Sequence, residues 1–452
     1  MLDNFMKFVA DANDFFWGPA ALVFLGLIGI FLTIGTKGVH MRKFGPILKN
    51  TIGKFGKDDD DDGSEGVLTS TQSMFTSLAS VIGMGSIVGV ASALISGGPG
   101  AILWMWIAAF IGMIIKYSEI IMIIKYRKKN EDGTYVGGPA LYVKEGLGIP
   151  AVGEILVALM ILVCLSSTMI QSNVIVENVV NMIPAAKKFV PVIAIINVIF
   201  AGIVVVGGVK RLGNVAEKLI PFMSMFYLIG AIIVIIANYK GIIPAIQQIF
   251  VGAFKPVAVA GGAAGYGIMK AMQYGIARGF FVSGAGQAVF TVSHAPAKVK
   301  NPVEQAVYGV TEIFLVTIIC TATGLSVLTS GVYTPQSNAA ILVTEAFAET
   351  TPLLGIAVGI ATVLFAYTTV IGFGYIGESQ LSTVMSASKA KLYRFVYLIA
   401  AFAGGVGALQ QIWDVTDFFL AIVMVINLIV MLLLSKEIFK ISNDYWDRLD
   451  VK

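Results

Sequence analysis

Two glycine-rich stretches lie where an uninterrupted membrane helix would not place them, and their backbone groups could bind a small solute. Gly83-Met84-Gly85-Ser86 lies in the middle of the apolar segment 67–95, and the run from Phe281 to Gly286 lies within the apolar segment 262–295. Amide and carbonyl groups released from a helix persist at membrane depth only where protein, water or a bound solute satisfies them. Paired breaks in the two halves of a chain therefore indicate a central binding site of the kind found in transporters.

The ends of interrupted helices suit a zwitterion. N–H groups at a helix N-terminus attract a carboxylate, and carbonyls at a C-terminus attract an ammonium group or a cation. Gly83 and Gly85 would open the first break, and Gly284 and Gly286 the second, because glycine lets a ligand approach the backbone closely. The alternative for the first stretch is a contact between helices through the small residues Gly85 and Gly89.

Two adjacent hydroxyls provide a possible cation site. Thr368 and Thr369 lie in the middle of the apolar segment 352–378, with no charged residue nearby in the sequence. Hydroxyl and carbonyl oxygens suit a hard monovalent cation, but each threonine could instead donate to the preceding helical turn. Phe281 and Phe373 could form walls of the same cavity, or could simply pack or contact lipid.

Composition fixes the class of protein. The chain has 452 residues, of which 57% are hydrophobic and only 13% charged, and its mean hydropathy is +0.85. A soluble domain would have about 25% charged residues. We therefore expect an all-α polytopic membrane protein that forms one integral domain over 1–452. The net charge of +4 is spread along the chain and does not indicate nucleic-acid binding.

Hydropathy gives eleven candidate transmembrane spans. They are approximately 15–36, 67–95, 99–126, 149–181, 189–208, 214–238, 262–295, 302–330, 352–378, 392–408 and 413–438. We interpret 15–36 as a peripheral first helix. The other ten divide into five-helix repeats at 67–238 and 262–438, each beginning with a broken helix. Because five is odd, the second repeat crosses the membrane in the opposite sense, as in an inverted repeat.

Loop charge predicts the orientation. Most of the 31 lysine and arginine residues fall in alternate loops, which the positive-inside rule places in the cytoplasm. The N-terminus is then outside, the C-terminus is cytoplasmic, and the protein lies in the cell (plasma) membrane. The acidic run at 58–62 falls in the first cytoplasmic loop, where we interpret it as a solvated segment.

Charged residues inside the spans need partners. Lys116 and Glu119 are three apart and could pair on one helix. Glu312 or an extracellular carboxylate could neutralise Arg278, and His294 is expected at the membrane interface. No convergent nucleophile, base or metal-ligand cluster is visible, so we do not expect an enzyme. A channel is disfavoured because no filter sequence or repeated acidic constriction appears.

Motifs along nearly the whole chain resemble those of the alanine/glycine:cation symporter family. The resemblance is carried by 83–91, Gly97-Gly98-Pro99-Gly100-Ala101, Trp104-Met105-Trp106, Lys116-Tyr117-Ser118-Glu119, Lys125-Tyr126-Arg127, Gly137-Gly138-Pro139, Ala277-Arg278-Gly279-Phe280-Phe281, Phe365-Ala366-Tyr367-Thr368-Thr369 and Trp413-Asp414. It implies eleven helices, ten of them in a five-plus-five inverted fold, and uptake of small amino acids with sodium or, in some members, protons.

The same resemblance implies a set of site residues. Backbone groups of Ala79 and Ile82 with the hydroxyls of Thr368 and Thr369 would hold one sodium ion. The substrate would lie among Gly83, Met84, Gly85, Ser86, Phe281, Ser283, Gly284 and Phe373. The chain departs from the family pattern here: Met84 and Ser86 replace a threonine and an asparagine, Val282-Ser283-Gly284 replaces Ser-Asn-Glu, and Phe373 replaces a tryptophan.

We therefore expect a secondary active symporter that takes up alanine or glycine with co-transported sodium by alternating access, without a covalent cofactor. The alternatives are a symporter for another small solute, and a receptor-like or coupling-defective relative.

Overall fold

The computed structural model describes residues 2–55, 64–254, 264–339, 341–407 and 410–450, and its helices follow the hydropathy closely. Prolines and polar caps set several helix starts. Asn301 caps α14 (Pro302–Ser330) with Glu304 as the reciprocal partner, and Thr351 caps α16 (Pro352–Val384). Both caps satisfy amides that the first helical turn leaves unpaired. The other long helices are α7 (Ala101–Lys125), α9 (Pro150–Met182), α10 (Val190–Val206), α11 (Gly208–Ala237) and α19 (Gln410–Leu433).

Seven helical segments in the described part of the chain are long and apolar enough to cross a membrane. An eighth is the pair α1 (Leu2–Phe16) and α2 (Pro19–Gly35), which bends by 43° between its members. Hydropathy predicts α2 but not the helix α1. The remaining predicted spans are α18 (Tyr393–Val406) and the two interrupted segments, which consist of shorter pieces. The total of eleven spans stays a prediction.

The first interrupted segment contains a break in the helix at the predicted glycines. Its first half is α5 (Ser70–Val81), which a Thr69–Gln72 capping box starts. A short 3-10 turn, η1 (Met84–Ser86), follows, and then α6 (Val88–Gly97). The i to i−4 hydrogen-bond ladder is therefore interrupted around Gly83, as the sequence predicts.

The second interrupted segment is more irregular. Its α-helix α13 (Ala264–Ser283) ends at the predicted break, and a 3-10 turn, η4 (Phe290–His294), follows. Gly284, Gly286 and Ala288 between them have φ of +65°, +80° and +58°. Left-handed backbone of this kind favours glycine, which explains two of the three residue choices.

Helices of the same rank in the two predicted repeats pack against each other: α7 against α14, α9 against α16, and α10 against α18. A two-fold relation between repeats would produce such pairs. The start of the first repeat also meets the end of the second interrupted segment, because Val67 N donates to Pro296 O (2.8 Å) and Lys298 N donates to Leu68 O (2.8 Å). The division into 67–238 and 262–438 stays a prediction.

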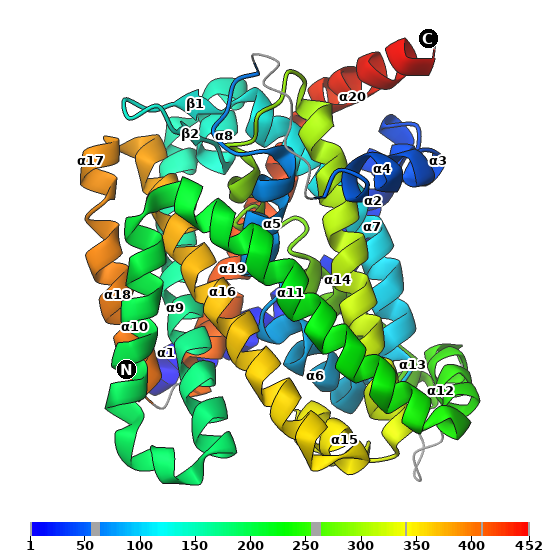
Figure 1. The fold of residues 1–452 in the computed structure, drawn as a ribbon. Coiled ribbons are helices and arrows are strands. Elements are labelled where there is room, and N and C mark those ends of the chain that lie inside the picture. Colours follow the sequence, from blue (N-terminus) through cyan, green and yellow to red (C-terminus); the bar gives the residue numbers. More distant parts are fainter. Residues whose placement is uncertain (1, 56–63, 255–263, 340, 408–409, 451–452) are drawn as a thin grey trace.

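The connecting elements gather at the two ends of the bundle (Figure 1). One end carries a small antiparallel hairpin, β1 (Lys128–Lys129) with β2 (Tyr135–Val136), together with other connecting helices; α12 and α15 lie at the opposite end. The connecting helices at the hairpin end are α3 (Val39–Arg42), α4 (Phe44–Ile52), α8 (Pro139–Leu147), α17 (Ala387–Ala390) and α20 (Ser435–Asp450). Those at the other end are α12 (Ile242–Phe254) and α15 (Leu342–Thr350). Two 3-10 turns, η2 (Pro184–Phe189) and η3 (Tyr239–Gly241), also connect helices.

The basic loops used to predict orientation lie at the hairpin end, which is accordingly the predicted cytoplasmic end. The acidic run at 58–62 lies outside the described residues.

Candidate functional site

The two interruptions lie against each other. A methyl group placed on Gly85 would come 3.4 Å from Val282 Cγ2 and 3.6 Å from the ring of Phe281. A methyl group on Gly83 would come 2.6 Å from the hydroxyl of Thr369 on α16. The glycines of the first break therefore let the second break and α16 approach its backbone closely.

A cavity of about 50 Å³ lies between these segments. Gly83 and Gly85 line it from the first break, and Phe281 and Val282 from the second. Its remaining walls come from α5, α9, η4, α16 and α19: Ser80, Val81, Val163, Ser167, Ile170, Gln171, Phe290, Thr369, Phe373, Trp413, Thr416, Asp417 and Leu420. A buried hollow with polar groups between aromatic walls suits a small polar solute. We call it the central cavity.

Four of the eight expected substrate residues line the central cavity: Gly83, Gly85, Phe281 and Phe373. Ser283 lies on the far side of α13, where it lines a smaller hollow with Met105 and Thr317. Ser86 is buried, and its carbonyl accepts a hydrogen bond from Thr323 (3.1 Å).

Gly284 packs against the ring of Phe290. The side chain of Met84 lies outside the described part of the structure. Each break thus lines the cavity with only some of its residues, and its other residues lie elsewhere in the protein.

The expected sodium residues lie on two helices that pack against each other, α5 with its end at Ile82 and α16. Ala79 and Ile82 are buried at the C-terminal end of α5, where helix carbonyls collect partial negative charge. The hydroxyls of Thr368 and Thr369 donate to Phe365 O at 2.9 and 3.0 Å. This is the back-bond that the alternative interpretation foresaw, but a hydroxyl that donates its proton keeps lone pairs for a cation. Of the four residues, Thr369 also lines the central cavity.

Several residues of the cavity were not anticipated from the sequence. Ser80 Oγ and Gln171 Oε1 are buried and have no hydrogen-bond partner among the described residues. The same holds for Asp417 Oδ1. Ser80 is next to the expected cation ligand Ala79 in the sequence, and Asp417 lies three residues after the motif Trp413-Asp414. Their closeness to these residues could have indicated them. Gln171 on α9 had no such signal.

Side chains from neighbouring helices replace the hydrogen bonds that the second break lacks. Lys116 Nζ on α7 donates to Ser283 O (3.2 Å), and Asn427 Nδ2 on α19 donates to Gly286 O (2.9 Å). Ala288 N donates to Glu119 Oε1 (3.1 Å). Because buried backbone groups must be paired, these three side chains make the irregular backbone tolerable inside the bundle.

The ion pairing inside the bundle differs from the expectation. Lys116 Nζ lies 2.5 Å from Glu312 Oε1 on α14, and neither side chain is exposed. Glu119 instead accepts a hydrogen bond from Asn427 (2.6 Å). The predicted Lys116–Glu119 pair is therefore wrong, and Glu312 is not the partner of Arg278.

His294 was expected at the interface but is fully buried, 3.1 Å from Glu312 Oε2. The short η4 turns back into the protein, so the histidine remains inside. Ser77 on α5 also donates to Glu312 (2.8 Å). Glu312 thus links α5, α7 and η4, and so connects both interrupted segments.

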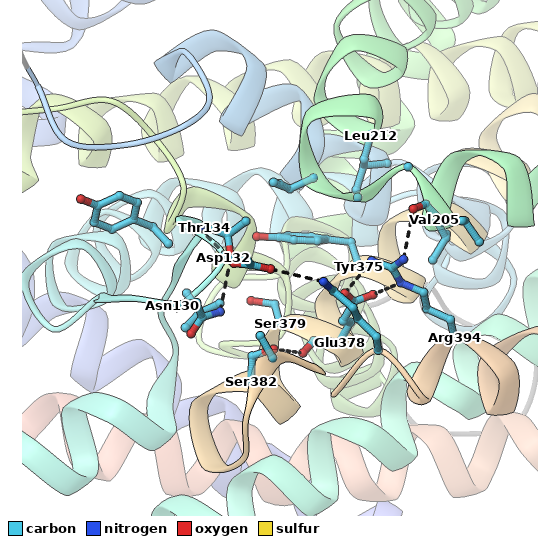
Figure 2. A pocket seen from close by; sticks show the side chains of 18 residues that line it. Asn130, Asp132, Thr134, Val205, Leu212, Tyr375, Glu378, Ser379, Ser382 and Arg394 are labelled. Carbon is cyan, nitrogen blue, oxygen red and sulfur yellow. Dashed lines mark hydrogen bonds and ion pairs between the residues drawn. The ribbon is translucent and has the colours of Figure 1, made fainter. Parts of the chain in front are cut away.

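A second cavity, of about 290 Å³, opens at the hairpin end of the bundle. Figure 2 shows residues of the hairpin, α16 and α18 converging on it. Arg394 binds Glu378 through two hydrogen bonds of 2.5 and 2.7 Å, and Lys391 lies 3.6 Å from Asp132. Partial burial opposes ionisation of Asp132, but hydrogen bonds from Thr134 and the charge of Lys391 hold the pKa of its carboxyl below the ordinary value. We call this the hairpin-end pocket.

One face of α16 runs from the expected sodium site to this pocket. Thr368, Tyr375, Ser379 and Ser382 are spaced by seven, four and three residues, which places them on one helix face. The last three line the hairpin-end pocket. At 1.5 Å per residue the face extends about 21 Å, so the two sites lie at different depths along the same helix.

Comparison with known proteins identifies the family. A model of the sodium:alanine symporter family matches residues 2–452. The chain belongs to this family. It is 35% identical to the sodium/alanine symporter AgcS of Methanococcus maripaludis, over 96% of this chain and 95% of that protein. It is 33% identical to the uncharacterized transporter YflA of Bacillus subtilis, over 98% and 94% of the two chains.

The fold also resembles solved transporters. The crystal structure of MhsT in complex with L-phenylalanine matches with a TM-score of 0.59 at 14% identity, covering 82% of this chain and 89% of that one. At this identity the likeness concerns the fold alone. Membership of this family shows that the protein is a membrane transporter and not an enzyme. The activity of the family is sodium-coupled symport of amino acids.

Proposed function

We propose that this protein takes up a small neutral amino acid, alanine or glycine, together with sodium, and that it does so by alternating access. The observation that carries the proposal is the meeting of the two breaks, with Gly85 against Phe281 and Val282, at a cavity that both line. A break in each half at a shared cavity is the arrangement that transporters use for a central solute.

The cavity favours a zwitterion with a small side chain. The C-terminal end of α5 would present carbonyls to an ammonium group, and amides of the break before α6 would face a carboxylate. Ser80 and Gln171 add unpaired oxygens. The rings of Phe281, Phe290 and Phe373 line the cavity, and its small volume favours a small side chain.

Sodium is the proposed coupling ion because the expected ligands are neutral oxygens. The carbonyls at the end of α5 and the hydroxyls of Thr368 and Thr369 supply such a set, and Ser80 Oγ is a further candidate. An ion held by the end of α5 and by α16 would fix the first break against α16. This is a direct way for sodium to prepare the substrate site.

Alternating access would open the central cavity to each side in turn. Phe281 stands on one side of it, and the hairpin-end pocket lies along α16 on the other. We propose that the protein lies in the cell membrane with the hairpin end in the cytoplasm. The ion pairs Arg394–Glu378 and Lys391–Asp132 would then hold the cytoplasmic side closed.

Uptake into proteoliposomes tests the proposal. Purified protein should accumulate radiolabelled alanine above the external concentration when an inward sodium gradient is imposed, and an ionophore that collapses the gradient should abolish accumulation. Equal uptake with and without the gradient would refute sodium coupling; a proton gradient in place of sodium is the matching control.

A competition panel of glycine, alanine, serine, glutamine and phenylalanine tests the substrate class. Glycine and alanine should compete best. Stronger competition by the large side chains would support the alternative of another solute. Sodium-dependent binding without flux would support the receptor-like or coupling-defective alternative.

A further inference from the structure

A third cavity lies outside the central one, on the side of Phe281 away from the hairpin end. It has a volume of about 140 Å³. Its walls come from the α1–α2 bend, α13 and α19: Asn13, Asp14, Trp17, Gln273, Tyr274, Ala277, Arg278, Phe281 and Asp417. Phe281 and Asp417 line both this cavity and the central one. We call it the outer cavity.

The outer cavity contains buried polar atoms that the protein leaves unsatisfied. Trp17 Nε1, Asn13 Oδ1 and Asp417 Oδ1 have no hydrogen-bond partner among the described residues. A buried polar atom without a hydrogen-bond partner is unfavourable. Three such atoms around one hollow indicate that something else binds there.

The charges in the outer cavity are of both signs. The guanidinium of Arg278 lies over the ring of Phe281, 5.7 Å from its centroid. Asp417 stands across the cavity on α19, and Asp14 adds a second carboxylate at the rim. Arg278 and the indole N–H of Trp17 can bind a carboxylate, whereas Asp417 and Asn13 Oδ1 can accept from an ammonium group. This combination matches a free amino acid.

The N-terminal helix is held in place to build this cavity. Asn13 Nδ2 donates to Asp414 O on α19 (2.8 Å), and the rings of Phe8 and Phe418 meet at 5.8 Å. The ring of Trp17 then reaches Phe281 edge to face, with centroids 6.5 Å apart. The end of α1 therefore forms part of the wall of the outer cavity.

We propose that the outer cavity is a second amino-acid site, in which the zwitterion waits before the Phe281 ring admits it to the central cavity. The inference rests on the proposed function, since it concerns the same substrate. The carboxylate binds Arg278 and Trp17, and the ammonium group binds Asp417 and Asn13. The helix α1 contributes two of these four residues.

Equilibrium binding of radiolabelled alanine to the purified protein in sodium tests the number of sites. We expect two molecules per chain. The double variant Trp17→Phe with Asn13→Ala keeps the aromatic ring and should bind one, whereas the control Trp446→Phe, at the hairpin end, should still bind two. One molecule per wild-type chain, or two in the double variant, would overturn the proposal.

Uptake kinetics separate this proposal from the proposed function. The double variant should raise the KM for alanine about tenfold while the sodium dependence stays unchanged. An unchanged KM in a transporting protein would overturn the outer site alone. Absence of sodium-driven uptake by the unmodified protein would instead refute the proposed function.

Discussion

Lys116 Nζ lies 2.5 Å from Glu312 Oε1 in the interior of the bundle, and the same ammonium group donates to Ser283 O at the end of α13. The ammonium group of Lys116 therefore neutralises a buried carboxylate and also donates a hydrogen bond to a carbonyl at the end of the interrupted helix. Ser77 and His294 bind the same carboxylate. The two interrupted segments are thus coupled through charge as well as through packing.

Removal of either partner should destabilise the protein strongly. An unpaired buried charge costs about 3–5 kcal/mol, so Lys116→Met and Glu312→Gln should each lower the unfolding temperature in detergent. The double variant should be more stable than the less stable single variant, because it leaves no unpaired charge. Lys144→Met, at an exposed position of α8, is the control. Additive losses in the double variant would show that the pair is not coupled.

Gly83→Ala should strongly reduce transport with little loss of folded protein. The added methyl group would lie 2.6 Å from Thr369 Oγ1, so the first break and α16 would have to move apart. We expect sodium-driven alanine uptake to fall at least about tenfold, equivalent to about 1.4 kcal/mol. Gly26→Ala is the matched control, since nothing lies within 4 Å of its added methyl group. Normal uptake by Gly83→Ala would place the solute elsewhere.

Thr369→Val should weaken sodium binding while keeping the shape of the side chain. The sodium concentration for half-maximal uptake should rise about tenfold, the effect of losing one ligand worth about 1.4 kcal/mol, and Thr369→Ser should restore it. Thr362→Val on the same helix removes a hydroxyl that bonds back to Val358 O (2.8 Å) and should have no such effect. Equal effects at the two positions would indicate a helix effect and not a sodium ligand.

Arg394→Gln should loosen the hairpin-end pocket. The change removes two hydrogen bonds to Glu378, so the pocket should open more often. In a background with Cys164→Ala and Cys320→Ala, the buried Ser379→Cys should react severalfold faster with a membrane-impermeant thiol reagent applied to that side. Arg448→Gln on α20 is the control. An unchanged labelling rate would mean that the ion pair does not hold the pocket closed.

Hydropathy and glycine placement were enough to predict most of the long helices and both interruptions. The predicted span 302–330 coincides with α14, and the break at Gly83 appears between α5 and α6. Such features depend on local composition and capping, which the sequence displays directly. The irregular backbone after Ser283 also follows from glycines that adopt positive φ.

Contacts between distant helices could not be predicted in the same way. Lys116 was assigned to Glu119 because they are close in sequence, whereas its partner lies 196 residues away on α14. His294 was judged by its place at the end of a span, although η4 is too short to reach an interface. Gln171 and Trp17 meet the solute cavities only through tertiary packing.

The position of α1 has a practical consequence for anyone handling this transporter. Asn13 and Trp17 form part of the wall of the outer cavity, where we propose that the solute enters, and the helix before them packs on α19. A bulky label attached at the exposed Asp14 would lie at that wall and obstruct it. Labels belong on α20, which lies among the hairpin-end elements, away from the outer cavity.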